Sequence, residues 1–149
     1  VSCADVVIAS TRAKFGLSEV RLGLAPAVIS PFVVSKIGES QARRYFLTGE
    51  RFGADTAKAI GLVHEVVEES RLDETVGGIL KALFKGGSQA QRASKELSRE
   101  SRLQMGPEEL DQANARLIAR LRVSEEGQEG LASFFEGRAP DWVSGEGSK

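Results

Sequence analysis

One carboxylate, Glu19, stands in a mostly apolar segment, residues 13–32, that glycine and proline interrupt. A carboxyl group buried without a fixed counter-charge favours its protonated form and can exchange a proton near neutral pH. Glu19 is therefore the best candidate for general acid–base chemistry. The alternative is a carboxylate that pairs with Arg21 or caps a short helix through Ser18. On composition alone this alternative is favoured, because an acid in a loop is usually ordinary surface.

The single histidine, His64, is the second residue whose chemistry needs an interpretation. It lies between Val63 and Glu65 in an apolar run, residues 62–67, that indicates an extended segment. No second histidine or nucleophile lies near it in sequence, so a structural position on a strand is favoured over catalysis. One histidine and one cysteine, Cys3, argue against a metal site and exclude an internal disulfide framework.

Composition narrows the class of protein. A chain of 149 residues with 41% hydrophobic and 28% charged residues is typical of a globular protein rather than a disordered one. Twenty basic and 21 acidic residues give a net charge of −1, which does not favour a nucleic-acid partner. No apolar run approaches the roughly 18 residues that span a bilayer. We therefore expect a cytoplasmic protein with no membrane partner.

Short elements must position Glu19. We predict a strand over residues 6–9, buried on both faces, and a turn at Glu19 that follows an extended piece near residues 14–17. Helices are predicted over residues 39–48 and 54–60, ended by Gly49 and Gly61. Few other segments could pair with the first strand, and the chain begins without methionine. We therefore expect the C-terminal part of a longer fold.

The second half of the chain is predicted to be helical. Apolar residues recur at helical spacing, with breaks at glycine, and Ser88 is expected to cap one helix. Charges of both signs alternate on the polar faces, which indicates solvated surfaces rather than a nucleic-acid interface. The apolar stripes favour self-association. The predicted helices span residues 72–84, 88–105, 107–121 and 124–135, and a frayed tail is predicted over residues 143–149.

A series of motifs identifies the chain as similar to the crotonase superfamily, the enoyl-CoA hydratases and isomerases. The ending, residues 129–142, resembles the C-terminal signature "EG..AF..KR...F" of that family. The motifs keep their order and spacing over nearly the whole chain. In order they are Ala4-Asp-Val-Val-Ile-Ala9, Ala13-Lys-Phe-Gly16, Glu19-Val-Arg-Leu-Gly-Leu-Ala-Pro26, Ala42-Arg-Arg-Tyr-Phe-Leu-Thr-Gly-Glu50 and Ala57-Lys-Ala-Ile-Gly-Leu-Val63.

The resemblance implies an α/β fold, the C-terminal part of a spiral of ββα turns followed by a helical oligomerisation region. Residues 1–68 would form the core with the acyl-pocket loop, and residues 69–149 the helical assembly region. The hydratases of the family add water across the 2,3 double bond of an enoyl-CoA with two glutamates, while two backbone N–H groups hold the thioester oxygen. Glu19 matches the second of these glutamates. The resemblance therefore favours a catalytic role for Glu19 over the structural one.

The resemblance also implies ligands and partners. The substrate is an acyl-CoA thioester, no cofactor is needed, and a homotrimer or a dimer of trimers is expected. The first glutamate and the glycine-rich oxyanion segment would precede Val1, so the chain alone is expected to be inactive. Residues matched to substrate or CoA contacts are Leu24, Pro26, Ser30, Phe134 and Trp142, although plain core packing explains the two aromatic residues about equally well.

The segment after Pro26 departs from the common pattern of the family. Many hydratases have a glycine-rich "GAGGTQRL" there, whereas this chain has Ala27-Val-Ile-Ser-Pro-Phe-Val-Val34. That variant resembles the branch acting on methylglutaconyl-CoA and isohexenylglutaconyl-CoA in leucine and acyclic-terpene breakdown. Ser30 could hydrogen-bond a polar acyl group, and Arg21 could pair either with a substrate carboxylate or with a structural partner.

Three functions are therefore open. The first is a hydratase of glutaconyl-type acyl-CoA substrates, with Glu19 as acid and base. The second is another activity of the same superfamily, an enoyl-CoA isomerase that would use one glutamate, or a decarboxylase or hydrolase. The third is a non-catalytic assembly module that relies on the apolar helix faces.

Overall fold

A computed structural model describes residues 1–100 and 106–144 of the chain. The chain divides into two compact units, Val1–Gly78 and Ile79–Lys149, which are treated separately below. Helix α3 (Leu72–Phe84) begins in the first unit and ends in the second, with the bounds predicted from its apolar spacing. Across the described residues, every helix is too short or too polar to cross a bilayer.

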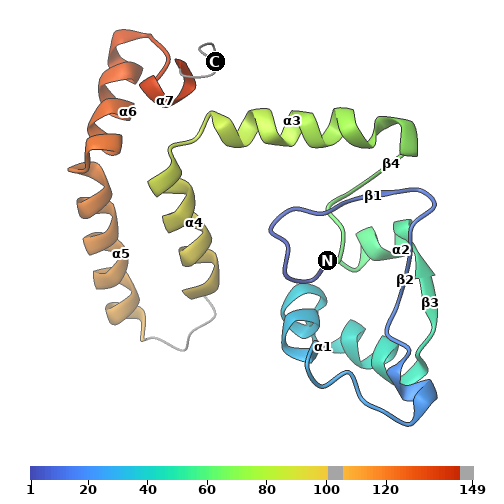
Figure 1. Ribbon diagram of the computed structural model, residues 1–149. Coiled ribbons are helices and arrows are strands. Elements are labelled where there is room, and N and C mark those ends of the chain that lie inside the picture. The colour runs from blue at the N-terminus through green and yellow to red at the C-terminus, as the bar shows by residue number, and fades with distance from the viewer. Residues whose placement is uncertain (101–105, 145–149) are drawn as a thin grey trace. The chain divides into compact units, whose positions relative to one another are not determined.

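Two small sheets form the strand part of the first unit (Figure 1). Strand β1 (Ile8–Ser10) pairs in parallel with β4 (Glu65–Val67), so that Ala9 lies opposite Val66. Strand β2 (Lys14–Gly16) pairs antiparallel with β3 (Arg51–Gly53), which places Phe15 opposite Phe52. β3 was not predicted.

The strand predicted over residues 6–9 is shifted and less buried than expected. The strand begins at Ile8, Val6 is 43% exposed, and Ala9 is the one fully buried position of β1. The reason is that, among the described strands, β1 pairs with β4 alone. The extended segment predicted over residues 62–67 likewise shortens to the three residues of β4.

Helices and short turns connect these strands along the chain. The turn η1 (Glu19–Leu22) precedes α1 (Ser30–Thr48), which bends at Gly38, where φ is 77° and ψ is 160°. The predicted helix over residues 39–48 is the part of α1 that follows this bend. The short α2 (Ala54–Ala59) and the turn η2 (Glu69–Arg71) complete the unit.

The core of the first unit lies where α1, α2 and β3 meet. Tyr45 of α1 is 2% exposed, and its ring centroid lies 4.2 Å from that of Phe52. Phe15 also stacks on Phe52, with ring centroids 5.8 Å apart. Aromatic pairs at these distances add to the stabilisation from apolar burial, so this cluster fixes α1 relative to the β2–β3 ribbon.

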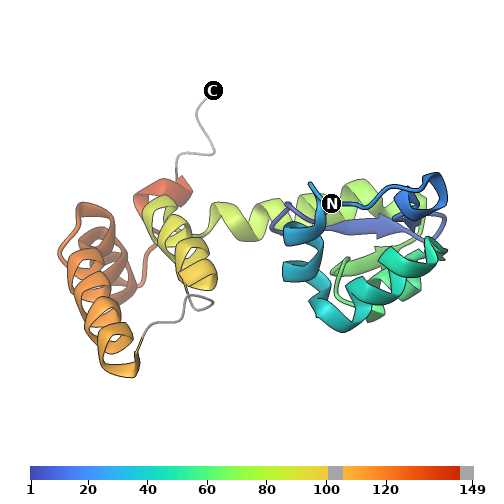
Figure 2. The same ribbon diagram turned by 90° about the horizontal axis from the view of Figure 1, so that it is seen from below.

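Helices make up the second unit, in which α4 and α5 lie side by side (Figures 1 and 2). The bounds are α4 (Ser88–Glu100), α5 (Pro107–Arg122), α6 (Glu125–Glu136) and α7 (Asp141–Ser144). The first three confirm the predicted helices. Residues 101–105 of the predicted helix 88–105, and residues 145–149 of the predicted frayed tail, lie outside the described residues.

A carboxylate from α6, not Ser88, caps the N-terminus of α4. Glu126 accepts hydrogen bonds from the backbone N–H groups of Gln89 and Ala90, both at 2.9 Å. The Ser88 hydroxyl itself donates to Glu126 at 3.2 Å, so the predicted capping role of Ser88 was wrong. A charged acceptor satisfies the free N–H groups of a helix start better than a hydroxyl does.

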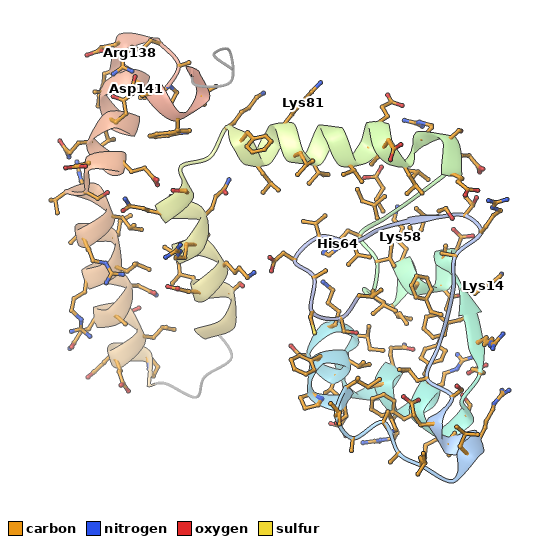
Figure 3. All side chains as sticks on the ribbon, in the orientation of Figure 1. Lys14, Lys58, His64, Lys81, Arg138 and Asp141 are labelled. Atoms are coloured by element: carbon orange, nitrogen blue, oxygen red, sulfur yellow. The ribbon has the colours of Figure 1, made fainter. Side chains whose placement is uncertain are left out.

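The C-terminal turn of this unit is held by a second carboxylate, Glu129. Its two oxygens accept from the Arg138 guanidinium at 2.6 and 2.8 Å, and one also accepts from the Asp141 N–H at 2.9 Å. Figure 3 shows Arg138 and Asp141 close together at this turn. The ring of Trp142 lies over Gly130, where a Cβ would come within 3.2 Å. These residues of the C-terminal signature therefore hold α6 and the turn that follows it together.

Candidate active site

Glu19 opens the turn η1, between β2 and α1, as predicted. The backbone of this turn is well connected, because Leu24 N–H donates to the Glu19 carbonyl at 3.1 Å. Gly23 ends the turn with φ at 72°, a left-handed conformation that glycine adopts without strain. The sequence thus folds this segment into a compact loop that holds Glu19 at its start.

One oxygen of the Glu19 carboxyl group lacks a hydrogen-bond partner within the described part of the chain. This atom, Oε2, is buried. Neither alternative raised by the sequence supplies a partner, because Arg21 forms no ion pair in the described part of the chain and the Ser18 side chain makes no capping hydrogen bond. A buried acceptor without a donor costs free energy, so such a group is expected where a ligand can supply the partner.

Several of the apolar side chains that follow Glu19 are exposed. Leu22 is 77% exposed, Leu24 is 63% exposed and Val28 is 84% exposed. Pro26, by contrast, is buried. Three exposed apolar residues therefore follow Glu19 closely in sequence, and we call Leu22, Leu24 and Val28 together the Glu19 apolar surface.

Ser30 begins α1 shortly after these residues. Its hydroxyl donates to the Ala27 carbonyl at 3.0 Å, and its N–H donates to the Pro26 carbonyl at 2.9 Å. The hydroxyl oxygen keeps its capacity to accept a further hydrogen bond. Four of the sequence-predicted site residues therefore lie in one short segment of the chain: Glu19, Leu24, Pro26 and Ser30.

His64 lies outside that segment and has a structural partner. Its Nδ1 accepts a hydrogen bond from the Val7 N–H at 3.0 Å, while its own N–H donates to the Val7 carbonyl at 2.9 Å. These contacts lead directly into the β1–β4 ladder. They agree with the structural interpretation that the sequence favoured, although His64 precedes the strand rather than lying within it.

The two aromatic site candidates belong to the second unit. Phe134 is 78% exposed and contacts Phe135 edge to face at 5.6 Å. Trp142 is partly buried, and its Nε1–H donates to the Lys85 carbonyl at 3.2 Å. Phe134 is therefore open to a ligand or partner, whereas Trp142 already has a structural contact.

Two carboxylates have pKa values displaced by the contacts described above. The Arg138 guanidinium, together with the Asp141 N–H, lowers the pKa of Glu129 to about 2. Burial acts to raise the pKa of Glu126, but its hydrogen bonds from Gln89, Ala90 and Ser88 outweigh that effect and lower it. Both groups are thus held in the charged form, which suits structural anchors rather than proton transfer.

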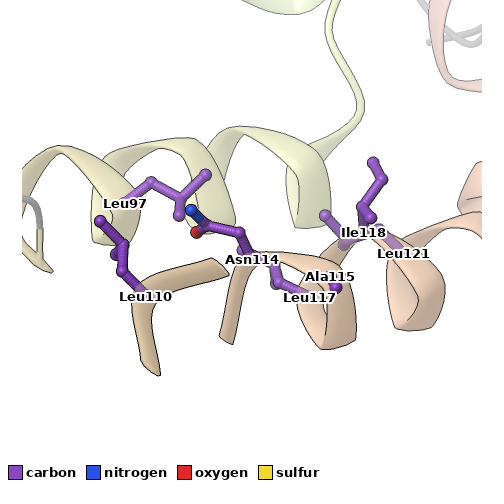
Figure 4. Close-up of a pocket in the computed structure, with 7 residues that line it drawn as sticks. All are labelled: Leu97, Leu110, Asn114, Ala115, Leu117, Ile118 and Leu121. Carbon is purple, nitrogen blue, oxygen red and sulfur yellow. The ribbon is translucent and has the colours of Figure 1, made fainter. Parts of the chain in front are cut away.

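An apolar groove of about 540 Å³ runs between α4 and α5 (Figure 4). One polar side chain, Asn114, interrupts its apolar lining, and Ile118 at its edge is 64% exposed. Its lining residues are Leu97, Leu110, Asn114, Ala115, Leu117, Ile118 and Leu121.

Comparison with known proteins agrees with this architecture. A model of the enoyl-CoA hydratase/isomerase family matches residues 1–145, so the chain belongs to that family. The resemblance to the crotonase superfamily is thereby confirmed, as is the α/β fold class.

Individual relatives give the extent of the similarity. The structure of an enoyl-CoA hydratase from Shewanella pealeana is 45% identical, with a TM-score of 0.86, over 95% of this chain and 52% of that one. Pseudomonas aeruginosa AtuE is 38% identical, with a TM-score of 0.89, over 95% and 55% of the two chains. The mevalonyl-coenzyme A hydratase sidH of Aspergillus fumigatus is 33% identical over 95% of this chain and 53% of its own length. The chain spans about half the length of the curated relatives it matches.

Sequence reasoning found Glu19 but missed how its turn is held. Gly49, expected only to stop a helix, lies directly against Val20 and Arg21 of η1. A glycine after a helical pattern is a local signal, whereas its partner in a distant turn leaves no trace in the spacing of residues.

Proposed function

We propose that this chain supplies one glutamate of an enoyl-CoA hydratase, an enzyme that adds water in the syn sense across a 2,3-unsaturated acyl-CoA thioester. The observation that carries the proposal is the buried Oε2 of Glu19, which has no hydrogen-bond partner among the described residues and is followed in sequence by the Glu19 apolar surface. A carboxyl oxygen without a protein donor is free to exchange a proton with substrate or water. Hydration of enoyl-CoA is one of the two reactions in the name of the family to which the chain belongs.

The proposed step uses Glu19 for a proton and other groups for the developing charge. As water adds to the double bond, its hydroxyl bonds to the β-carbon and a proton reaches the α-carbon. Glu19 exchanges that proton, and a thioester enolate forms transiently. We propose that the first glutamate and the two N–H groups that stabilise the enolate oxygen belong to a part of the enzyme that this chain does not span. This chain alone is then inactive, and no cofactor is required.

The Glu19 apolar surface suits an acyl chain. Leu24 and Pro26 would contact the acyl group or the thioester arm, and Ser30 keeps an acceptor for a polar acyl substituent. Arg21 has no ion-pair partner in the described part of the first unit, so its guanidinium is available to a substrate carboxylate. These features support a glutaconyl-type branched substrate.

Contacts with CoA and between subunits are proposed for the helical unit. The exposed Phe134 would contact CoA, with Trp142 as a neighbouring aromatic group. The apolar groove between α4 and α5 would contribute to a homotrimer or a dimer of trimers, because exposed apolar surfaces of this kind mark sites of association.

The test is hydration of enoyl-CoA thioesters by the full-length protein and its Glu19→Gln variant. Glutamine keeps the shape of the side chain but cannot transfer a proton, so turnover should fall by about 10²–10⁴-fold. Glu65→Gln, at an exposed strand position of the same unit, is the matched control and should keep wild-type turnover.

Two further measurements in the same assay identify the preferred substrate and the reaction. A glutaconyl-type thioester should be hydrated with a higher kcat/KM than crotonyl-CoA. Double-bond migration without hydration would instead indicate the isomerase of the same family. Near-normal hydration by Glu19→Gln would contradict the assignment of Glu19.

A further inference from the structure

We propose that Gly49 is a positioning residue for Glu19, because the absence of a side chain at Gly49 lets the turn η1 settle against the end of α1. The proposal rests on the function proposed above for Glu19. It concerns a residue in a different element, separated from Glu19 by the whole of α1.

The backbone of Gly49 has a conformation that suits glycine. Its φ is 59° and its ψ is 16°, in the left-handed region, and its N–H donates to the Tyr45 carbonyl at 3.0 Å to end α1. Gly49 is also buried. Other glycines of the chain end helices in the same way, so conformation alone does not set Gly49 apart.

Contact with η1 distinguishes Gly49 from the other glycines that end helices. A Cβ built on Gly49 would lie 3.0 Å from Cγ1 of Val20, and 3.2 Å from both Cγ and Nε of Arg21. Such distances are shorter than ordinary carbon–carbon contacts of about 3.5–4.0 Å. Val20 and Arg21 are the two residues that directly follow Glu19, so any side chain at position 49 must displace the turn that carries Glu19 or the side chains next to it.

The α1 side of this contact is the more firmly held. Tyr45, one turn before Gly49, is buried against Phe52. On the other side of Gly49, Glu50 forms an ion pair with Arg44 at 2.7 Å, and its N–H donates to the Thr48 hydroxyl. The end of α1 is thus fixed to the core and to the start of β3. Strain at position 49 is therefore relieved by movement of η1, where Val20 is 39% exposed.

The first experiment compares two glycine substitutions in the full-length protein. Gly49→Ala introduces both backbone strain and the contact with η1. Gly137→Ala introduces the same left-handed strain, since φ is 67° there, but its Cβ would meet no atom of the described residues within 4 Å. Displacement of a catalytic group by a few tenths of an ångström should lower kcat of Gly49→Ala by about 10-fold, with KM within about 2-fold of wild type. Gly137→Ala should keep both constants.

A second pair of variants tests the contact from the η1 side without placing strain at position 49. Val20→Ala removes the Cγ1 atom that faces Gly49, so η1 should loosen and kcat should fall by about 3-fold. Val20→Thr keeps a branched side chain of the same size and should retain wild-type kcat. This pair decides the question should Gly49→Ala fail to fold.

Backbone amide shifts and hydrogen exchange, measured by NMR, provide a readout that is independent of activity. Gly49→Ala and Val20→Ala should shift the amides of η1 and speed exchange of the Leu24 N–H, which donates to the Glu19 carbonyl. Wild-type kcat and unchanged η1 amides in Gly49→Ala, or in Val20→Ala if Gly49→Ala does not fold, would overturn the proposal. If Glu19→Gln keeps its turnover while the η1 amides still shift, the function assigned to Glu19 fails and the contact between Gly49 and η1 stands.

Discussion

Glu19 in the first unit and two carboxylates of the second unit, Glu126 and Glu129, differ in their hydrogen bonds. In the first unit, a buried oxygen of Glu19 has no partner among the described residues. In the second unit, Glu126 accepts three hydrogen bonds, and Glu129 accepts two from Arg138 and one from Asp141 N–H. The second arrangement stabilises a fold, whereas the first costs stability and leaves a group ready to react.

This contrast separates Glu19, the residue proposed to be catalytic, from the structural residues of the C-terminal signature. The turn motif around Glu19 presents a free carboxyl oxygen and is followed by exposed apolar side chains. The C-terminal signature instead joins α6 to the following turn through Glu129 and Arg138. The two motifs therefore have different physical roles. Substitutions in the turn motif should affect activity, whereas substitutions in the C-terminal signature should affect stability.

The largest effect on stability is expected at Glu126. Glu126→Ala removes the acceptor of three donors at the start of α4, which should lower the free energy of unfolding of the 149-residue chain by about 2 kcal/mol. Chemical denaturation followed by far-UV circular dichroism measures this loss. Glu125→Ala is the matched control, because Glu125 is the neighbouring residue in α6, and a loss equal to that of Glu126→Ala would show that the cap is not the cause.

A smaller effect of the opposite sign is expected at Glu19. Glu19→Met keeps the length of the side chain and removes the unpartnered oxygen, so the free energy of unfolding should rise by about 1 kcal/mol. The same denaturation experiment measures the gain. A destabilised Glu19→Met variant would show that the carboxyl group has a structural partner, and the contrast between the two units would then fail.

The smallest effect concerns the acid dependence of stability, and it tests Glu129. Its pKa is lowered from an ordinary value of 4.5 to about 2 in the folded chain. The unfolded state therefore binds the proton more readily, and the stabilisation from Glu129 is complete above about pH 4.5 and is lost as the pH falls towards 2. Glu129→Gln should flatten the curve of unfolding free energy against pH in that range. Parallel curves for the two proteins would contradict the assignment.

Local patterns in the sequence were sufficient for α3 and for the part of α1 after Gly38, but the first half of α1, residues 30–37, was not predicted. The bounds of α3 follow from apolar residues at helical spacing and from the glycines near its end, which are properties of neighbouring residues. The turn at Glu19 was predictable for the same reason. Strand β3 was missed because it has three residues and depends on pairing with β2, from which α1 separates it.

The site was predictable only in part. The family motif and the isolated charge pointed to Glu19, but the free Oε2 depends on which side chains fail to reach it in the folded chain. The capping of α4 was assigned to Ser88 because Ser88 is adjacent in sequence, whereas the true acceptor, Glu126, comes from another helix. Contacts between distant segments decided both outcomes.

The most direct test of the central claim is exchange of the α-proton of an acyl-CoA thioester with deuterated water. Wild-type full-length protein should introduce deuterium at the α-carbon, and Glu65→Gln should do so at the same rate. Glu19→Gln should lose this exchange by about 10²-fold or more, because the group that moves the proton is absent. Exchange by Glu19→Gln at the wild-type rate would contradict the claim that the free oxygen of Glu19 transfers the proton.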